Sequence, residues 1–240
     1  MNTITEIRGN IFESSCQTIV NTVNCVGVMG KGIALEYKSR FPEMYDDYVR
    51  YCSEKRIKPG VLHLWKKSTP WILNFPTKNQ WKHPSRIEYI RLGLEKFAAT
   101  YVTRGISSIA FPELGTSSGG LNWKEVRSVM YGILEPLPNL QIEIYHYDPS
   151  VQDTLFDKLY QRIHRFDVQD FFQHLRIGKK QAKILIEALD SGMLHNMQEL
   201  KALEGIGDRT IEALYRFNES ACDNSKRIVT NSERQLSLPF

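Results

Sequence analysis

"VNTVNCVGVMGKGIALEYKSRFP", residues 20–42, joins a short apolar run to a glycine-rich segment and then to an amphipathic stretch. The β-branched residues at its start predict a strand, and the apolar spacing after Gly32 predicts a helix. Gly27, Gly30 and Gly32 lie at the junction, where glycine lets the backbone approach a ligand closely. Amide groups at a helix N-terminus donate outward to an anion such as a pyrophosphate. This stretch therefore predicts a strand, a ligand-binding loop and a helix in succession.

The same alternation of patterns runs through the first 149 residues. Runs of β-branched and aromatic residues predict strands at residues 4–9, 18–24, 61–66, 71–76, 106–112 and 141–147. Amphipathic spacing predicts helices at residues 30–41, 42–55, 86–105 and 122–137. Together these elements predict an α/β domain in which helices pack over a sheet.

A second glycine-rich segment, "FPELGTSSGGLNW" at residues 111–123, also follows a predicted strand. Its residues from Gly115 to Gly120 are placed to close over the same anion from the other side. One glycine loop alone is equally explained by the needs of a turn. Two loops at the ends of two strands of one sheet favour a phosphate-containing ligand, because open α/β sheets bind ligands at that edge.

A third segment, "NFPTKNQWKHPSR" at residues 74–86, is basic and contains no acid. The chain has a net charge of +4, but between Lys55 and Arg91 it has nine Lys or Arg residues and one acid. Such a patch attracts a polyanion such as nucleic acid, although a solvated face explains the same charges. Trp81 either stacks on a base between Lys82 and Arg86 or packs against its own domain.

Several classes of protein are disfavoured by composition. No apolar run is long enough for a transmembrane helix and the N-terminus lacks a signal peptide pattern, so we expect a cytoplasmic protein with no membrane partner. The cysteines lack metal-ligand spacing and the six histidines are scattered, so we expect no metal site and no cofactor. The cysteines are Cys16, Cys25, Cys52 and Cys222.

The three segments, in this order, resemble macrodomains of the DarG type, the antitoxins of DarT/DarG systems, which are similar to the terminal ADP-ribose protein glycohydrolases. The resemblance covers about residues 4–149 and implies a macrodomain at residues 1–149, with a mixed sheet and helices on both faces. It implies ADP-ribosylated, single-stranded DNA as substrate, ADP-ribose as product and a DarT-like toxin as partner. The alternative is a non-catalytic ADP-ribose reader, or an antitoxin that acts by binding its toxin.

The resemblance also assigns residues. Lys78 matches the catalytic lysine, Asn24 matches the residue that hydrogen-bonds the distal ribose, and Asn21 shapes the same loop. The other residues that it assigns to ADP-ribose binding are Asn10, Ile11, Gly27, Met29, Gly30, Lys31, Gly32, Ile33, Pro112, Leu114, Gly115, Thr116, Ser117, Ser118, Gly119 and Gly120.

Two chemical roles are open to Lys78. A neutral amine, with its pKa lowered by Lys82 and Arg86 or by burial, attacks the anomeric carbon and forms a Schiff base. A cationic amine instead stabilises the departing base or orients the ribose.

Three positions depart from the family pattern. Asn10 replaces the usual aspartate that binds the adenine amino group, and its carbonyl accepts the same hydrogen bond without the charge. Ser117 replaces a glycine of the phosphate loop. Gly119 occupies the position of the catalytic aspartate of protein-directed relatives, so Lys78 is expected to work without that partner.

Residues 154–218 read as a separate helical domain with turns at "RIGKK", "LDSGML" and "LEGIGDRT". "LKALEGIGDRTIEALYRF" resembles a helix-hairpin-helix motif, which implies that Gly205, Gly207 and Arg209 contact a DNA phosphate. "LRIGKKQAKILIEAL" is a candidate second, less regular copy. A plain helical turn that ends in glycine explains the same letters.

The final segment, residues 219–240, is polar until its last six residues and is expected to be disordered. Those six residues resemble the peptide that binds the bacterial sliding clamp, with chance similarity as the alternative. The residues that would enter the clamp groove are Gln235, Leu236, Leu238 and Phe240.

Overall fold

The computed structural model describes residues 4–151 and 153–218. The chain divides into two compact units, residues 1–151 and residues 152–240, which are called here the N-terminal and C-terminal units. The predicted boundary between residues 149 and 154 lies at this division. None of the helices in the described ranges is long and apolar enough to cross a membrane.

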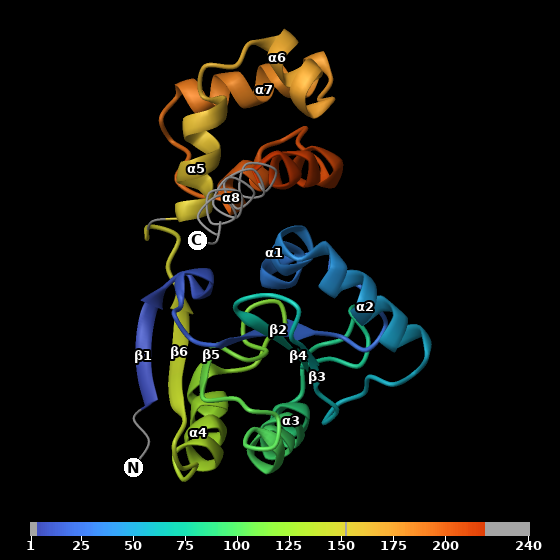
Figure 1. Ribbon diagram of the computed structural model, residues 1–240, viewed down its shortest axis with the longest axis vertical. Helices are drawn as coiled ribbons and strands as arrows, with labels where there is room; N and C mark the ends of the chain where they lie inside the picture. Colours follow the sequence, from blue (N-terminus) through green and yellow to red (C-terminus); the bar gives the residue numbers. More distant parts are fainter. Residues whose placement is uncertain (1–3, 152, 219–240) are drawn as a thin grey trace, which may run out of the picture. The chain divides into compact units, whose positions relative to one another are not determined.

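The N-terminal unit alternates strands and helices along the chain (Figure 1). Its strands are β1 (Ile4–Gly9), β2 (Thr18–Val23), β3 (His63–Trp65), β4 (Trp71–Pro76), β5 (Ser108–Pro112) and β6 (Gln141–Tyr147). Its helices are the short 3-10 turn η1 (Ile11–Glu13) and α1 (Gly32–Arg40), α2 (Pro42–Ser53), α3 (Ile87–Thr100) and α4 (Trp123–Leu134).

The six strands form one mixed sheet in the order β1-β6-β5-β2-β4-β3. Only β3 is antiparallel to its neighbour; the other pairs are parallel, so β1, β2, β4, β5 and β6 end at the same edge. Strand β2 lies between β5 and β4, and Asn21 is paired with Asn74 in register. The three motifs of the sequence therefore follow three adjacent parallel strands.

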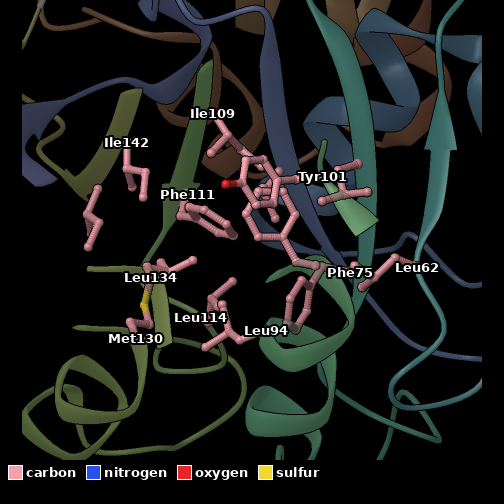
Figure 2. Packing of buried hydrophobic residues seen from close by; sticks show 14 of the residues in the cluster. Leu62, Phe75, Leu94, Tyr101, Ile109, Phe111, Leu114, Met130, Leu134 and Ile142 are labelled. Carbon is pink, nitrogen blue, oxygen red and sulfur yellow. The ribbon is translucent and has the colours of Figure 1, made fainter. Parts of the chain in front are cut away.

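Helices cover both faces of this sheet, as expected for a macrodomain-like α/β fold. On one face, α3 and α4 bury a cluster that includes Phe75, Leu94 and Phe111 (Figure 2). On the other face, α1 and α2 bury a cluster that contains Tyr37 and Tyr48. The backbone of α3 approaches β4 closely, because a Cβ on Gly93 would lie 2.1 Å from the ring of Phe75. Glycine at this position is therefore required by packing.

The described part of the C-terminal unit consists of helices joined by short turns. Its helices are α5 (Thr154–Ile163), α6 (Val168–Leu175), α7 (Lys179–Asp190) and α8 (Met197–Ala202), followed by a helical stretch at residues 208–218. These helices enclose their own core, which includes Phe171, Leu185 and Leu214.

Several predicted elements are longer than the observed ones, most clearly the third predicted helix. The helix predicted at residues 86–105 ends at Thr100, and residues 101–105 form turns, with Gly105 at a φ of +72°. A turn before Val168 was also not predicted. It is stabilised by a capping box in which Asp167 accepts from the amide of Asp170 and Asp170 accepts from the amide of Asp167.

Candidate active site

The candidate site lies at the edge of the sheet where β2, β4 and β5 end. Hydrogen bonds join the segment after β4 to the loop after β2. The amide of Thr77 donates to the carbonyl of Val23 at 2.9 Å, and the amide of Cys25 donates to the carbonyl of Asn79 at 3.1 Å. The thiol of Cys25 donates to the carbonyl of Lys78 at 3.3 Å. Lys78 is thus fixed beside the end of the "VNTVN" motif.

The side chain of Lys78 connects this pair of segments to the glycine-rich loop after β5. Its Nζ donates a hydrogen bond of 2.6 Å to the carbonyl oxygen of Ser118. Burial lowers the pKa of Lys78 below its usual value of 10.5, because the charged form loses contact with water. The sequence offered two explanations for a lowered pKa of Lys78, burial or the charges of Lys82 and Arg86. Burial lowers this pKa, and Lys82 and Arg86 are not among its causes.

The loop at residues 115–120 is a tight turn that requires glycine. Gly115 and Gly120 have φ angles of +71° and +79°, which favour glycine over other residues. A Cβ on Gly119 would lie 2.1 Å from the carbonyl oxygen of Gly115 and 2.4 Å from Oγ of Ser85. The amide of Ser85 donates to the carbonyl of Gly119 at 2.9 Å. Ser85 therefore packs against the loop and holds it by a hydrogen bond, a role that could not be predicted from the sequence.

The side chain of Asn24 makes several hydrogen bonds within the protein. Its Oδ1 accepts from the amides of Val26 and Val28 at 3.0 and 3.3 Å and from the hydroxyl of Tyr48 at 3.2 Å. Its Nδ2 donates to the carbonyl of Val28 at 2.5 Å, which leaves one amide hydrogen for a ligand. Asn24 thus shapes the loop after β2, and its predicted contact with the distal ribose remains a prediction.

A buried chain of polar side chains supports the same loop from within. Nδ2 of Asn21 donates to Oδ1 of Asn74 at 2.8 Å and lies 3.8 Å from the sulfur of Met29. Nδ2 of Asn74 lies 3.0 Å from Nδ1 of His63, and Nε2 of His63 lies 3.0 Å from Oδ2 of Asp47. Oδ1 of Asn21 is buried and has no partner among the described residues. This chain joins the loop residue Met29 to helix α2.

A second polar cluster supports the loop after β5. Nδ1 of His146 lies 2.6 Å from a carboxylate oxygen of Glu113, and Nε2 lies 2.8 Å from Glu6. The hydroxyl of Thr116 donates to Glu113 at 3.2 Å, so the cluster reaches the glycine loop. The ring of Trp123 packs edge-on against His146. The scattered histidines in the chain gave no sign of this contact between His146 and a loop carboxylate.

The remaining predicted ligand residues occupy the same edge of the sheet but differ in exposure. Ile11, Met29 and Leu114 are buried in the hydrophobic core, so they stabilise the loops from beneath. Asn10 caps η1, because its Oδ1 accepts from the amide of Phe12 at 3.1 Å. The predicted ligand positions along the loops that are partly or fully exposed are Gly27, Gly30, Lys31, Gly32, Ile33, Pro112, Gly115, Thr116, Ser117, Ser118 and Gly120.

The basic segment after Lys78 faces solvent. Trp81 is 50% exposed, and Nζ of Lys82 lies 5.2 Å from the centre of its ring. Arg86 is also exposed, at the N-terminal end of α3. Of the two alternatives for Trp81, packing within its own domain is therefore the weaker one.

Comparison with known proteins agrees with this arrangement. The family profile of the macro domain matches residues 20–130. The solved macrodomain of Thermus aquaticus DarG is 39% identical, with a TM-score of 0.58, and the match covers 61% of this chain and 99% of that chain. The N-terminal unit belongs to the macro domain family. The macrodomain of Mycobacterium tuberculosis DarG gives a similar match, with 38% identity and a TM-score of 0.59.

Curated relatives of this macrodomain bear the name DNA ADP-ribosyl glycohydrolase. The protein of Thermus aquaticus is 40% identical over 143 residues, and that of Mycobacterium tuberculosis is 39% identical over 146 residues. These matches cover 58% and 59% of this chain but only 40% and 42% of the relatives. The chain therefore spans less than half the length of the curated relatives that it matches.

Proposed function

We propose that this protein is a DNA ADP-ribosyl glycohydrolase that removes ADP-ribose from modified bases of single-stranded DNA, with Lys78 as the catalytic residue. The main support is the placement of Lys78. Its amine lies at the junction of the loops after β2, β4 and β5, and burial lowers its pKa. The similarity to proteins named DNA ADP-ribosyl glycohydrolase supports the same reaction.

The lowered pKa favours a nucleophilic role for Lys78. The neutral amine attacks the anomeric carbon and forms a C–N bond, while the base leaves with the electrons of the glycosidic bond and takes up a proton. Opening of the ribose ring then converts the adduct to an imine. Water hydrolyses the imine, which releases ADP-ribose and restores the amine.

An ADP-ribosylated thymidine oligonucleotide tests the proposal. Wild-type protein is expected to release ADP-ribose, and Lys78→Ala is expected to lose release while keeping ADP-ribose affinity. Lys78→Arg keeps the cation but cannot form an imine, so its inactivity favours the nucleophilic role. Borohydride is expected to fix ADP-ribose on Lys78 of the wild type. A wild type that binds ADP-ribose without releasing it from DNA would show the non-catalytic reader instead.

The exposed residues Trp81, Lys82 and Arg86 hold the DNA strand beside the site. A base stacks on the ring of Trp81, and the two cations contact phosphates. Trp81→Ala is expected to raise KM for an oligonucleotide but not for an ADP-ribosylated mononucleotide. Equal effects on both substrates would contradict this role.

The C-terminal unit binds DNA, and one candidate contact is a helix-hairpin-helix element. Its turn joins α8 to the helical residues 208–218, with Gly205 at a φ of +86° and Ile206 buried. Gly205, Gly207 and Arg209 would face the phosphate, since backbone amides position DNA without reading its sequence. Gly207→Pro removes an amide and is expected to weaken binding of an unmodified oligonucleotide. If Gly207→Pro binds the oligonucleotide as the wild type does, this segment is a plain helical turn without a role in DNA binding.

Two partners complete the proposal. A DarT-like toxin would supply the modified DNA, in the cytoplasm, and neutralisation of such a toxin by Lys78→Ala protein would favour the binding antitoxin. The tail peptide with Gln235, Leu236, Leu238 and Phe240 lies outside the described residues and is proposed to bind the bacterial sliding clamp. A clamp pull-down that persists after deletion of residues 235–240 would remove that partner.

A further inference from the structure

The helical hairpin of α6 and α7 has an unusual charge pattern. Residues 176–183, which form its turn and the first part of α7, contain four cations and no acid. All four side chains are exposed, and none has an ion pair among the described residues. This group is called here the basic hairpin patch, and it consists of Arg176, Lys179, Lys180 and Lys183.

The "LEGIGDRT" turn has the opposite character, although its sequence is the more regular. Residues 203–210 contain one cation, Arg209, and two acids, Glu204 and Asp208. Gly205 of this turn lies against α7, since a Cβ there would be 2.8 Å from the side chain of Ile184. Ile184 directly follows Lys183 of the basic hairpin patch. A DNA strand near both turns is therefore attracted to α7 and repelled by the two acids.

An exposed aromatic ring accompanies the patch. Phe171 is fully buried and fills the core of the unit, whereas its neighbour Phe172 is 55% exposed. The guanidinium of Arg176 lies 5.8 Å from the centre of the Phe172 ring. Arg176 is held at this place because it ends α6 with a φ of +58°, and its amide donates to the carbonyl of Phe172 at 3.0 Å. Aromatic rings next to cations are the surface on which unpaired bases stack.

We infer that the basic hairpin patch with Phe172, rather than the "LEGIGDRT" turn, is the main nucleic-acid contact of the C-terminal unit, and that it prefers single-stranded DNA. Phosphates lie on Lys179, Lys180 and Lys183, and one base stacks on Phe172 beside Arg176. This inference rests on the proposed binding of DNA by the C-terminal unit and names the surface that carries it.

The test is the binding of a fluorescent oligo-dT and of a duplex to the full chain, measured by anisotropy over a range of salt. A double variant, Lys179→Gln with Lys180→Gln, is expected to bind oligo-dT on the order of tenfold more weakly at low salt. Its slope of log K against log salt is expected to fall by about 1.4, because each phosphate contact to a single strand contributes about 0.7. Phe172→Leu keeps an apolar side chain and is expected to reduce the preference for oligo-dT over duplex.

A matched double variant controls for net charge. Lys158→Gln with Arg165→Gln removes two exposed cations elsewhere in the same unit and is expected to bind oligo-dT nearly as the wild type does. Hydrolysis of an ADP-ribosylated mononucleotide confirms in each variant that the macrodomain is intact. Equal weakening by both double variants would overturn the inference, because total charge would then explain it.

The remaining outcomes separate this inference from the proposed function. If Gly207→Pro and Arg209→Gln abolish binding while Lys179→Gln with Lys180→Gln leaves it unchanged, the inference fails and DNA binding by the unit stands. If no variant of the C-terminal unit changes DNA binding, both are wrong. If the full chain binds an acidic protein through the basic hairpin patch but binds no DNA there, the inference is also overturned.

Discussion

Nζ of Lys78 donates a 2.6 Å hydrogen bond to the carbonyl oxygen of Ser118, so the candidate catalytic amine touches the loop on the far side of the site. A carbonyl oxygen accepts from an ammonium and from a neutral amine alike, so this contact does not require the charged form. Burial disfavours the charge. The site therefore holds an amine in position while lowering the cost of its neutral state.

The first prediction concerns the pH dependence of cleavage. Because the pKa of Lys78 is lowered from 10.5, the neutral amine becomes available at a lower pH than for a free lysine. With a nucleophilic Lys78, kcat/KM for an ADP-ribosylated oligonucleotide is expected to rise with pH and to level off below pH 10.5. With a cationic Lys78 the rate would fall over the same range. A profile from pH 6 to 10 in a single ionic strength separates the two.

The second prediction concerns Gly119. In Gly119→Ala the new methyl group would collide with the carbonyl of Gly115 and with Ser85, and a backbone carbonyl cannot move aside alone. The loop is expected to shift, with a loss of stability of about 1–3 kcal/mol and a loss of ADP-ribose binding by calorimetry. Gly132→Ala is the control, because Gly132 lies within α4 with open space around its Cβ position. That variant is expected to bind ADP-ribose normally and to gain about 0.5–1 kcal/mol. Normal binding by Gly119→Ala would show that the loop does not need its tight turn.

The sequence predicted the positions of the strands and the three loops, because period-two and helical patterns and glycines are local signals. It predicted Lys78 only through a resemblance, since a lysine in a basic segment is ordinary. It did not predict Ser85, whose role depends on contact with Gly119, 34 residues away. Nor did it predict that His146 on β6 meets Glu6 on β1 and Glu113 after β5, because strand order is a long-range property.

The third prediction concerns His146. Burial alone would lower its pKa, but hydrogen bonds to Glu113 and Glu6 outweigh this and raise it above 6.5. A raised histidine pKa stabilises the fold below the unfolded value, and this contribution is lost as pH rises through the folded value. His146→Asn is therefore expected to lower the free energy of unfolding more at pH 6 than at pH 9, as measured by urea denaturation.

The same cluster makes the stability of the fold depend on pH in the acid range through Glu6. A hydrogen bond from Tyr131, with those from His146 and Arg127, outweighs burial and lowers the pKa of Glu6 to about 2. This contribution is present above the unfolded value of 4.5 and is lost as pH falls toward about 2. Glu6→Gln is expected to be less stable than the wild type at pH 6, with the difference disappearing near pH 2. A difference that does not depend on pH would mean that the cluster acts by shape alone.

The fourth prediction concerns His63, whose behaviour is opposite to that of His146. Burial lowers its pKa below 6.5, although Asp47 acts against this through a hydrogen bond and its charge; Arg50 and Arg56 lower it further. Because the unfolded chain then binds the proton more readily, stability falls as pH drops below 6.5. The neutral ring accepts from Asn74 at Nδ1 and donates to Asp47 at Nε2. Protonation of His63 turns Nδ1 into a donor, which then faces the Nδ2 donor of Asn74.

A variant of Asn74 shows whether this chain positions the loop after β2. Asn74→Leu removes the acceptor of Asn21 Nδ2 and the donor to His63 Nδ1, and it is expected to cost about 1–3 kcal/mol of stability by urea denaturation. Because Asn21 also contacts the sulfur of Met29, ADP-ribose affinity is expected to weaken in the same variant. Thr100→Val, which removes an exposed hydroxyl at the end of α3, is the control and should leave that affinity unchanged. If Asn74→Leu is destabilised but binds ADP-ribose as tightly as the wild type, the buried chain serves the fold and not the site.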